Sequence, residues 1–434
     1  MNFSAHRPRA AIFVVACLAA VLGLSATASA RPTFGIQGMW PDESPTTLNH
    51  QLDVAQRVGA KQVRIGVQWR QLQPTGPDAY DATYLAAVDR TMAAASARHL
   101  KVVLFVTQTP CWASTAPASA KAACTATTTP YEVYRYPPAD PATFAKMSSF
   151  LVARYQAGLA AYEVWNEPDQ SNENYWAGPD KVARYVAMVK AAYGPLKQAA
   201  PKVPVLAGSF VGGNGKWLQA MYHAGIKGYY DGLAVHFYDL PLYALKVTRQ
   251  TQKANGDSKP EWLTEFGWNS CYRKGGPATR EQHRCITPAV QASALNDLAK
   301  AVRNTSWLKS AILYQVDDEN ADYRFGLFDT AGKRKPSYNV FDHLMHGGLT
   351  GGLPRPTVRL RVRGGQLVAS GRASIDDVFK LTASVGGQLR YRANLRSDRS
   401  GLWTVKFPKS IGTSGVKVHI ASFWSSSVAS SASR

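Results

Sequence analysis

Two short stretches, EVWNEP at residues 163–168 and WLTEFG at residues 262–267, each place a glutamate at the end of an apolar, strand-like run. Burying a carboxylate is costly unless the group is paired or hydrogen-bonded. Two such strands in one chain therefore indicate that Glu167 and Glu265 serve a chemical purpose. The interpretation of the remaining sequence starts from these two positions.

Around the two stretches, apolar runs alternate with amphipathic helical patterns from residue 33 to residue 346. Continuous apolar strands, each followed by a helix, favour a parallel sheet that is covered on both faces. Eight such units in roughly 310 residues match a (β/α)₈ TIM barrel. An open doubly wound sheet is the alternative, but no glycine-rich phosphate turn follows the first strand. Strands are predicted at 34–38, 62–69, 102–108, 161–167, 205–210, 232–238, 261–267 and 310–316, and helices at 48–58, 84–99, 141–155, 179–200, 287–304 and 335–346.

The composition changes at the glycine-rich segment HGGLTGGLP, residues 346–354. From Val358 to Arg363, apolar residues then alternate with arginines, which is the period of a strand. More short strands are predicted around 367–370, 378–385, 389–393, 402–407 and 416–423, with a tight hairpin turn at Gly386-Gly387. We therefore predict an α/β fold in which the barrel is followed by a small C-terminal all-β sandwich domain.

The N-terminus has the pattern of a secretory signal peptide. Basic residues from His6 to Arg9 precede fifteen apolar residues, 10–24, and ASA at 28–30 fits a cleavage site. The apolar run is shorter than the ~20 residues of a membrane-spanning helix. The predicted divisions are a signal peptide (1–30), a catalytic barrel (31–346), a linker (347–356), a basic β-sandwich (357–424) and a Ser-rich, frayed tail (425–434). We expect a secreted protein, extracellular or associated with the cell surface.

Four cysteines remain after the predicted signal peptide: Cys111, Cys124, Cys271 and Cys285. Their proximity in the chain favours the disulfides Cys111–Cys124 and Cys271–Cys285, although four cysteines allow three pairings. There is no C-x-x-C motif, and the nine histidines lack the spacing of metal ligands. We therefore predict neither a metal nor any other cofactor.

The net charge of +21 is concentrated near the C-terminus, where residues 351–434 contain 14 Lys/Arg and 3 Asp/Glu, a net of +11. Such a field favours anionic partners, so the β-sandwich could bind an anionic polymer or a cell surface. A soluble basic surface without a partner is the alternative. No nucleic-acid-binding motif is present, and we expect no nucleic acid as partner.

In a (β/α)₈ barrel, the active site lies at the carboxyl ends of the strands. Glu167 ends the fourth predicted strand and Glu265 lies near the end of the seventh, so their side chains can converge across the mouth. Glycosidic bond cleavage needs one carboxylic acid that protonates the leaving oxygen and a second carboxylate opposite it. The pattern therefore predicts a glycosidase.

The WNEP and TEFG segments, together with FGLFD (325–329) and KPSY (335–338), resemble clan A of the glycoside hydrolases, especially family 39 and the cellulase-like family 5. The resemblance covers the whole barrel region. It implies a retaining double displacement on a β-linked polysaccharide or oligosaccharide, with Glu167 as acid/base and Glu265 as nucleophile. It further implies that Asn166 binds the sugar 2-hydroxyl and that Arg64 keeps the nucleophile ionised. His236 and Tyr238 match groups near the nucleophile.

The eighth strand departs from this pattern, because it reads LYQVD (313–317) where many relatives carry a tryptophan under the sugar. Trp40 and Trp268, both next to strand ends, are expected to bind substrate instead. The long segment 109–140 is expected to wall one end of the cleft. Arg64 could equally form a structural ion pair, and His236 could be an ordinary buried histidine.

The prediction is thus a monomeric, metal-independent O-glycosyl hydrolase. A catalytically retired barrel that binds carbohydrate or a cell surface is the alternative.

Overall fold

The computed structural model describes residues 32–211, 215–238, 244–271, 285–303, 305–348, 355–374, 377–398, 401–422 and 426–430. The predicted signal peptide and most of the predicted linker lie outside these residues. Both assignments, and the domain boundaries drawn from them, stay predictions.

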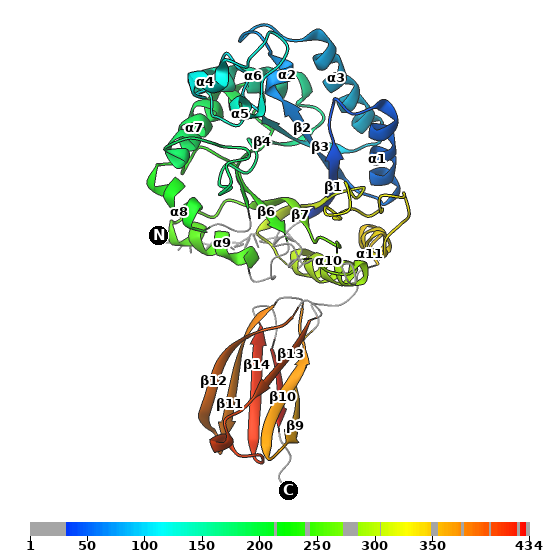
Figure 1. The fold of residues 1–434 in the computed structure, drawn as a ribbon, viewed down its shortest axis with the longest axis vertical. Helices are drawn as coiled ribbons and strands as arrows, with labels where there is room; N and C mark the ends of the chain where they lie inside the picture. The colour runs from blue at the N-terminus through cyan, green and yellow to red at the C-terminus, as the bar shows by residue number, and fades with distance from the viewer. Residues whose placement is uncertain are drawn as a thin grey trace, which may run out of the picture. The chain divides into compact units, whose positions relative to one another are not determined.

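Eight parallel strands close into a barrel in sequence order, and β8 pairs with β1 to complete the ring (Figure 1). The predicted (β/α)₈ barrel is confirmed. Seven strands lie within two residues of their predicted positions. The fourth, however, ends at Val164, so Glu167 follows the strand and does not terminate it. The strands are β1 (Thr33–Met39), β2 (Gln62–Gln68), β3 (Lys101–Thr107), β4 (Leu159–Val164), β5 (Val205–Val211), β6 (Gly232–Tyr238), β7 (Glu261–Gly267) and β8 (Leu308–Tyr314).

A helix follows each strand, and the helices surround the barrel in Figure 1. Ser44 and Asp140 cap α1 and α6 through their side-chain oxygens, and a proline begins each of these helices. The helices expected after the fifth and sixth strands are α8, which is short, and α9, which is mostly polar; no bounds were predicted for them from the sequence. The long helices are α1 (Pro45–Arg57), α3 (Ala82–Ala97), α6 (Pro141–Tyr155), α7 (Lys181–Ala199), α8 (Gly215–His223), α9 (Leu245–Ala254), α10 (Pro288–Arg303) and α11 (Pro336–Met345); short helices are α2 (Trp69–Leu72), α4 (Ala118–Lys121) and α5 (Tyr131–Tyr134).

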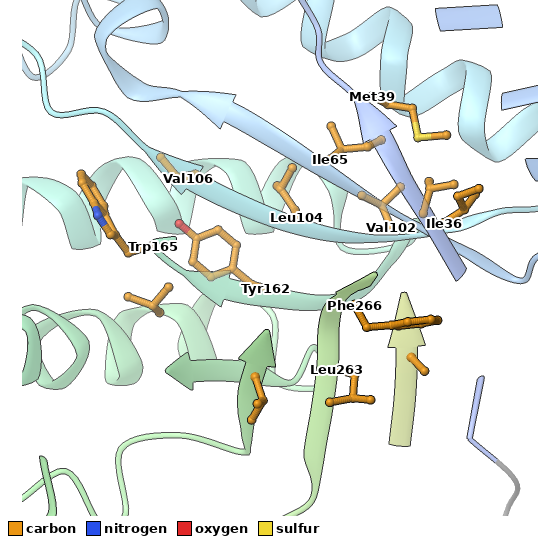
Figure 2. Packing of buried hydrophobic residues seen from close by; sticks show 14 of the residues in the cluster. Ile36, Met39, Ile65, Val102, Leu104, Val106, Tyr162, Trp165, Leu263 and Phe266 are labelled. Atoms are coloured by element: carbon orange, nitrogen blue, oxygen red, sulfur yellow. The ribbon is translucent and has the colours of Figure 1, made fainter. Parts of the chain in front are cut away.

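The main apolar core fills the layer between the strands and the helices. Figure 2 shows part of it, with Ile65, Leu104 and Tyr162 coming from the adjacent strands β2, β3 and β4. A smaller cluster lies apart from this core and takes one buried residue from each of five strands: Val103, Ala161, Leu206, Ala234 and Ile312. Residues that alternate with the helix-facing ones point into the barrel, so its interior is packed too.

The C-terminal strands form two antiparallel sheets, shown in orange to red in Figure 1. One sheet has the order β13-β10-β9 and the other the order β12-β11-β14-β15. Apolar side chains from both sheets, among them Leu367, Phe379 and Trp403, share a second core, which confirms the small all-β region. The strands are β9 (Arg359–Arg363), β10 (Gln366–Arg372), β11 (Val378–Val385), β12 (Gln388–Arg396), β13 (Leu402–Lys406), β14 (Val416–Ser422) and β15 (Ser426–Ser430).

Two details of this β region test the sequence interpretation. The predicted hairpin turn is confirmed, since Gly386 and Gly387 join β11 to β12 with φ of 56° and 79°, which a type I′ turn requires of both residues. The prediction of a frayed tail over residues 425–434 is wrong in part, because Ser426–Ser430 pair with β14 as strand β15. Backbone pairing satisfies the edge of β14 and needs no particular side chains, which is why a serine-rich sequence did not reveal it.

The four cysteines pair as predicted, with Cα–Cα distances of 6.2 Å for Cys111–Cys124 and 4.9 Å for Cys271–Cys285. The first disulfide closes part of the long segment between β3 and α6. Within the described ranges, no helix combines the length and the apolar character needed to cross a bilayer.

One buried carboxyl group at the start of β7 should make stability depend on pH. Glu261 is 1% exposed and accepts a hydrogen bond of 2.9 Å from Thr248, and burial raises its pKa to about 8. Between the ordinary value of 4.5 and pH 8, the folded protein keeps a proton that the unfolded chain has lost. The free energy of unfolding therefore falls as pH rises through this window, by up to about 1.4 kcal/mol per unit from this group.

We expect Glu261→Gln to remove this contribution. Urea unfolding at pH 5, 6.5 and 8 should show a flatter loss of stability in the variant than in the wild type. Glu132→Gln, which changes an exposed glutamate, serves as control and should leave the slope unchanged. Equal slopes for wild type and Glu261→Gln would contradict the assignment.

Candidate active site

The two predicted catalytic carboxylates meet at the mouth of the barrel. After β4 ends, Trp165 and Glu167 take left-handed backbone conformations, with φ of 71° and 44°. The resulting tight turn is anchored by the buried Trp165 indole, which donates a 2.8 Å hydrogen bond to the carbonyl oxygen of Tyr175. Glu265 reaches the same place from β7. One oxygen of each carboxylate and one ring nitrogen of His236 lie within 4.8 Å of one another.

A cleft of about 580 Å³ opens above the two carboxylates. Of the predicted site residues, Trp40, Asn166, Glu167, Tyr238 and Glu265 line it. Its walls are rich in aromatic rings, which suit the apolar faces of sugars, while the two carboxylates and several amides supply polar contacts. The aromatic lining residues are Trp40, Phe105, Tyr131, Tyr134, Tyr175, Tyr238, Tyr314, Tyr323 and Phe325.

Beneath the cleft, the fully buried Arg64 joins both catalytic strands. Its Nε donates to Glu163 at 2.6 Å, its Nη1 donates to Glu265, and its Nη2 donates to the Asn166 side-chain oxygen at 2.9 Å. Nη1 also contacts Gln37 at 2.9 Å, and Gln37 in turn donates to Glu265 at 3.2 Å. One guanidinium therefore orients the catalytic carboxylate of β7 and the amide that precedes Glu167.

Arg64 is held by a third carboxylate, Glu163, which has no exposed surface. Glu163 also accepts hydrogen bonds from Thr264, at 2.8 Å, and from Ser209. Burial alone would raise the pKa of Glu163, but Arg64 and then His236 outweigh it and lower the value to about 2. Glu163 therefore stays ionised and balances the buried guanidinium.

His236 lies among three carboxylates. Its Nδ1 is 2.8 Å from Glu167 and 3.4 Å from Glu265, and its Nε2 is 3.8 Å from Glu163. Burial would lower the pKa of His236, but Glu265, Glu163 and Glu167 together raise it to about 10. The imidazole is therefore protonated at neutral pH and donates its Nδ1 hydrogen bond to Glu167.

The two catalytic candidates have different surroundings. Burial raises the pKa of Glu167, and the charge of Glu265 adds to this rise, while His236 opposes it. Glu265 instead accepts hydrogen bonds from Arg64, Gln37 and the Tyr238 hydroxyl. Burial and then the nearby Glu265 raise the pKa of Tyr238 well above its usual value, so the phenol stays a neutral donor. These differences suit one carboxyl group that donates a proton and a second that hydrogen-bond donors hold in place.

Three residues predicted to bind substrate lie elsewhere. Arg64 and His236 are fully buried behind the carboxylates and do not line the cleft. Trp268 is a core residue, 4% exposed, that packs edge-on against Phe237 and Phe266. It follows Gly267, the last residue of β7, so strand alternation does not determine the direction of its side chain. Expecting it in the cleft was wrong.

Other residues of the site were missed or underrated. Glu163 could have been found, because a charged residue inside an apolar strand is itself a signal. Gln37, Ser209 and Gln170, which donates to Glu167, carried no such signal. On β8, Tyr314 lines the cleft and packs 5.6 Å from Tyr238 between ring centres, so an aromatic ring is present although tryptophan is not.

The long segment 109–140 does contribute a wall of the cleft, as expected. Tyr131 and Tyr134 line it, and the Tyr131 hydroxyl donates to Asn174 at 2.8 Å. Trp112 lies outside the lining, since it packs against Trp69 and donates to the Gln73 carbonyl at 2.8 Å.

Glu167, His236 and Glu265 also form the one group of potential metal ligands found within the described part of the chain. Arg64 already supplies positive charge to Glu265. This charge balance favours carboxylate chemistry without a metal. The absence of a metal requirement stays a prediction.

A barrel mouth with two opposed carboxylates in an aromatic cleft is the arrangement of a glycosidase. In agreement, the family model described as cellulase (glycosyl hydrolase family 5) matches residues 24–296. The chain belongs to this family and is an O-glycosyl hydrolase. No curated protein matches its sequence.

Solved structures with the same fold include family 39 members, which agrees with the resemblance to clan A. The family 39 enzyme of Xanthomonas axonopodis pv. citri has 14% identity and a TM-score of 0.56, covering 87% of this chain and 91% of its own. The family 39 glycoside hydrolase of Bacteroides cellulosilyticus WH2 has 16% sequence identity and a TM-score of 0.53, and the match covers 85% of this chain and 80% of that protein. A monomeric β-xylosidase of Caulobacter crescentus CB15 has 16% sequence identity and a TM-score of 0.54, and the match covers 87% of this chain and 95% of that protein. At these identities, the likeness shows the fold alone.

The buried position of Glu163 predicts that Glu163→Gln destabilises the protein by about 3 kcal/mol, because it leaves Arg64 short of one buried counter-charge. Urea unfolding measures this loss. Glu132→Gln breaks an exposed ion pair of the same 2.6 Å length, with Arg135, and should cost less than about 1 kcal/mol. Similar losses in both variants would show that Glu163 does not hold Arg64 as described.

Proposed function

We propose that this hydrolase is a secreted, retaining enzyme that cleaves β-linked glycosidic bonds in a polysaccharide or oligosaccharide. Glu167 acts as acid/base and Glu265 as nucleophile. The observation that carries the proposal is the approach of the two carboxylates to within 4.8 Å at the floor of an open cleft.

The short gap supports retention of configuration. Retaining enzymes separate the two carboxyl groups by about 5–5.5 Å, whereas inverting enzymes leave about 6.5–9.5 Å for a water molecule between them. Here one oxygen of Glu167 and one of Glu265 lie within 4.8 Å of each other, which fits the shorter separation. A nucleophilic carboxylate that attacks the sugar directly fits this space.

In the first step, a carboxylate oxygen of Glu265 attacks the anomeric carbon while Glu167 gives its proton to the leaving oxygen. A glycosyl ester on Glu265 and a free alcohol result. In the second step, Glu167 takes a proton from water, the water oxygen bonds to the anomeric carbon, and the ester bond to Glu265 breaks. Arg64 and Tyr238 hold Glu265 in place for both steps.

Asn166 is placed to bind the sugar next to the reacting carbon. Its side-chain oxygen accepts a hydrogen bond from Arg64, which orients the amide so that its NH₂ group is free to donate in the cleft. A donor at this position suits the 2-hydroxyl of the sugar. Trp40, Tyr238 and Tyr314 supply aromatic surface beside it.

The two disulfides support export, because such bonds persist in oxidising compartments. We propose that residues 1–30 direct this export and that the mature enzyme acts as a monomer. A catalytically retired barrel is less favoured, because the carboxylate pair, its arginine and an open cleft are all in place.

Glu167→Gln and Glu265→Gln should each lower kcat by about 10²-fold or more, because each removes a group that takes part in the chemical steps. A panel of aryl β-glycosides and β-linked polysaccharides, assayed for released phenol and reducing ends, measures the loss. Both variants should still unfold cooperatively, and Glu265→Gln should be the less stable of the two because it removes a buried counter-charge of Arg64. Glu173→Gln, an exposed residue of the same loop outside the cleft lining, is the matched control.

The two roles can be separated with azide, a small external nucleophile. Glu265→Gly with azide should give a glycosyl azide of inverted anomeric configuration, and Glu167→Ala should give one of retained configuration, both read by NMR. Full activity of either variant without azide, or inverted sugar from the wild type, would overturn the assignment.

The raised pKa of Glu167 also predicts a pH profile. Because the acid must be protonated to act, kcat/KM should fall on the alkaline side as Glu167 loses its proton, with an apparent pKa above the ordinary 4.5. With a substrate whose leaving group needs no protonation, such as a dinitrophenyl glycoside, Glu167→Gln should lack this limb. An alkaline limb that survives in the variant would assign it to another group.

A further inference from the structure

We propose that the outer face of the four-stranded sheet binds an acidic polysaccharide, at a site separate from the catalytic cleft. This basic face consists of the outward side chains of β11, β12 and β14 that carry positive charge or can acquire it: Lys380, Arg390, Arg392, Arg396, Lys417 and His419. The inference goes beyond the proposed glycosidase activity and does not depend on it.

The orientation of the basic face follows from strand alternation. On β11, Phe379, Leu381 and Ala383 are buried in the sandwich core, so Lys380 points outward. On β14, Val416, Val418 and Ile420 are buried in the same way, so Lys417 and His419 point outward. The arginines of β12 alternate with half-buried Tyr391 and Leu395, which pack against that core. All of the arginines and lysines of the basic face are exposed.

Strand register brings these charges together. Thr382 of β11 pairs with Arg392 on one side and with His419 on the other, which makes one row across three strands. Lys380 lies opposite Asn394, between Arg392 and Arg396. Neighbouring strands lie about 4.8 Å apart, and residues two positions apart on one strand are separated by about 7 Å. Neighbouring cations of the basic face therefore lie within about 10 Å of each other. Their fields therefore overlap at physiological salt.

Strands β11, β12, β14 and β15 contain neither aspartate nor glutamate, and the nearest acidic residue after β12, Asp398, lies two residues past Arg396. A flat surface with one sign of charge attracts a polymer that carries repeated negative charges. Exposed guanidinium groups suit carboxylates in particular, since they donate two parallel hydrogen bonds to them.

The side chains between the cations favour a polysaccharide over other polyanions. Thr382, Ser384 and Asn394 offer hydroxyl and amide groups that can bond to sugar hydroxyls. Apart from the His419 imidazole, the outward positions of β11, β12 and β14 carry no aromatic ring on which a nucleic-acid base could stack. Among the described residues of these strands, Leu389 is the one large apolar side chain that is exposed, so they offer little apolar surface for insertion into a membrane. The chemistry therefore points to a chain of sugars that bears carboxylates.

Binding of the full-length protein to polygalacturonate, measured by isothermal titration at low salt, tests the proposal. The triple variant K380Q/R392Q/R396Q should bind at least roughly tenfold more weakly than the wild type, since three ion pairs are lost. The matched control is R359Q/R361Q/R363Q, which removes the same charge from the exposed arginines of β9 in the other sheet. It should bind within roughly twofold of the wild type.

The same titrations with dextran, duplex DNA and anionic phospholipid vesicles identify the partner. We expect no binding to neutral dextran, tighter binding to polygalacturonate than to DNA or vesicles, and loss of all binding at 1 M salt. Equal losses in the two triple variants would mean that net charge alone acts. Tighter binding to DNA or vesicles would overturn the partner class, and undiminished binding by K380Q/R392Q/R396Q would overturn the site.

Discussion

The buried ion pair between Arg64 and Glu163 is the interaction on which the active site depends. A guanidinium without exposed surface is tolerated only when its charge is balanced and its donors are used. Glu163 supplies the balance from within β4, and Ser209 and Thr264 complete the hydrogen bonds of that carboxylate. Arg64 can then contact Glu265 and Asn166, which lie on different strands and far apart in the chain.

The same buried carboxylate influences the other half of the site through His236. Three carboxylates around one imidazole keep it protonated, and its proton is directed at Glu167. Glu167 thus has a donor on one side and desolvation on the other, while Glu265 is surrounded by Arg64, Gln37 and Tyr238. Identical side chains can therefore take different roles, because fixed charges and hydrogen-bond donors are distributed unequally between them.

The β-sandwich uses charge in another way. At the active site of the barrel, the positive groups of Arg64 and His236 are buried and lie beside carboxylates, which serves positioning. In the sandwich, exposed arginines and lysines lie on strands that contain no aspartate or glutamate, which gives this surface a net positive field. A binding surface on the sandwich would hold the enzyme near polymeric material and so raise the local concentration of substrate.

The sequence alone determined the barrel, the sandwich, the disulfide pairing and the two opposed glutamates. These depend on local signals: strand-length apolar runs, turn glycines, cysteine proximity and carboxylates at strand ends. Tertiary structure decided which side chains meet. In the folded protein, Glu163, Gln37 and Ser209 lie around the catalytic pair. Tyr314 lines the cleft, and Trp268 is buried in the core. Such contacts join strands distant in the chain, and the direction of a side chain beyond a strand end depends on the path of the following loop, which no local pattern encodes.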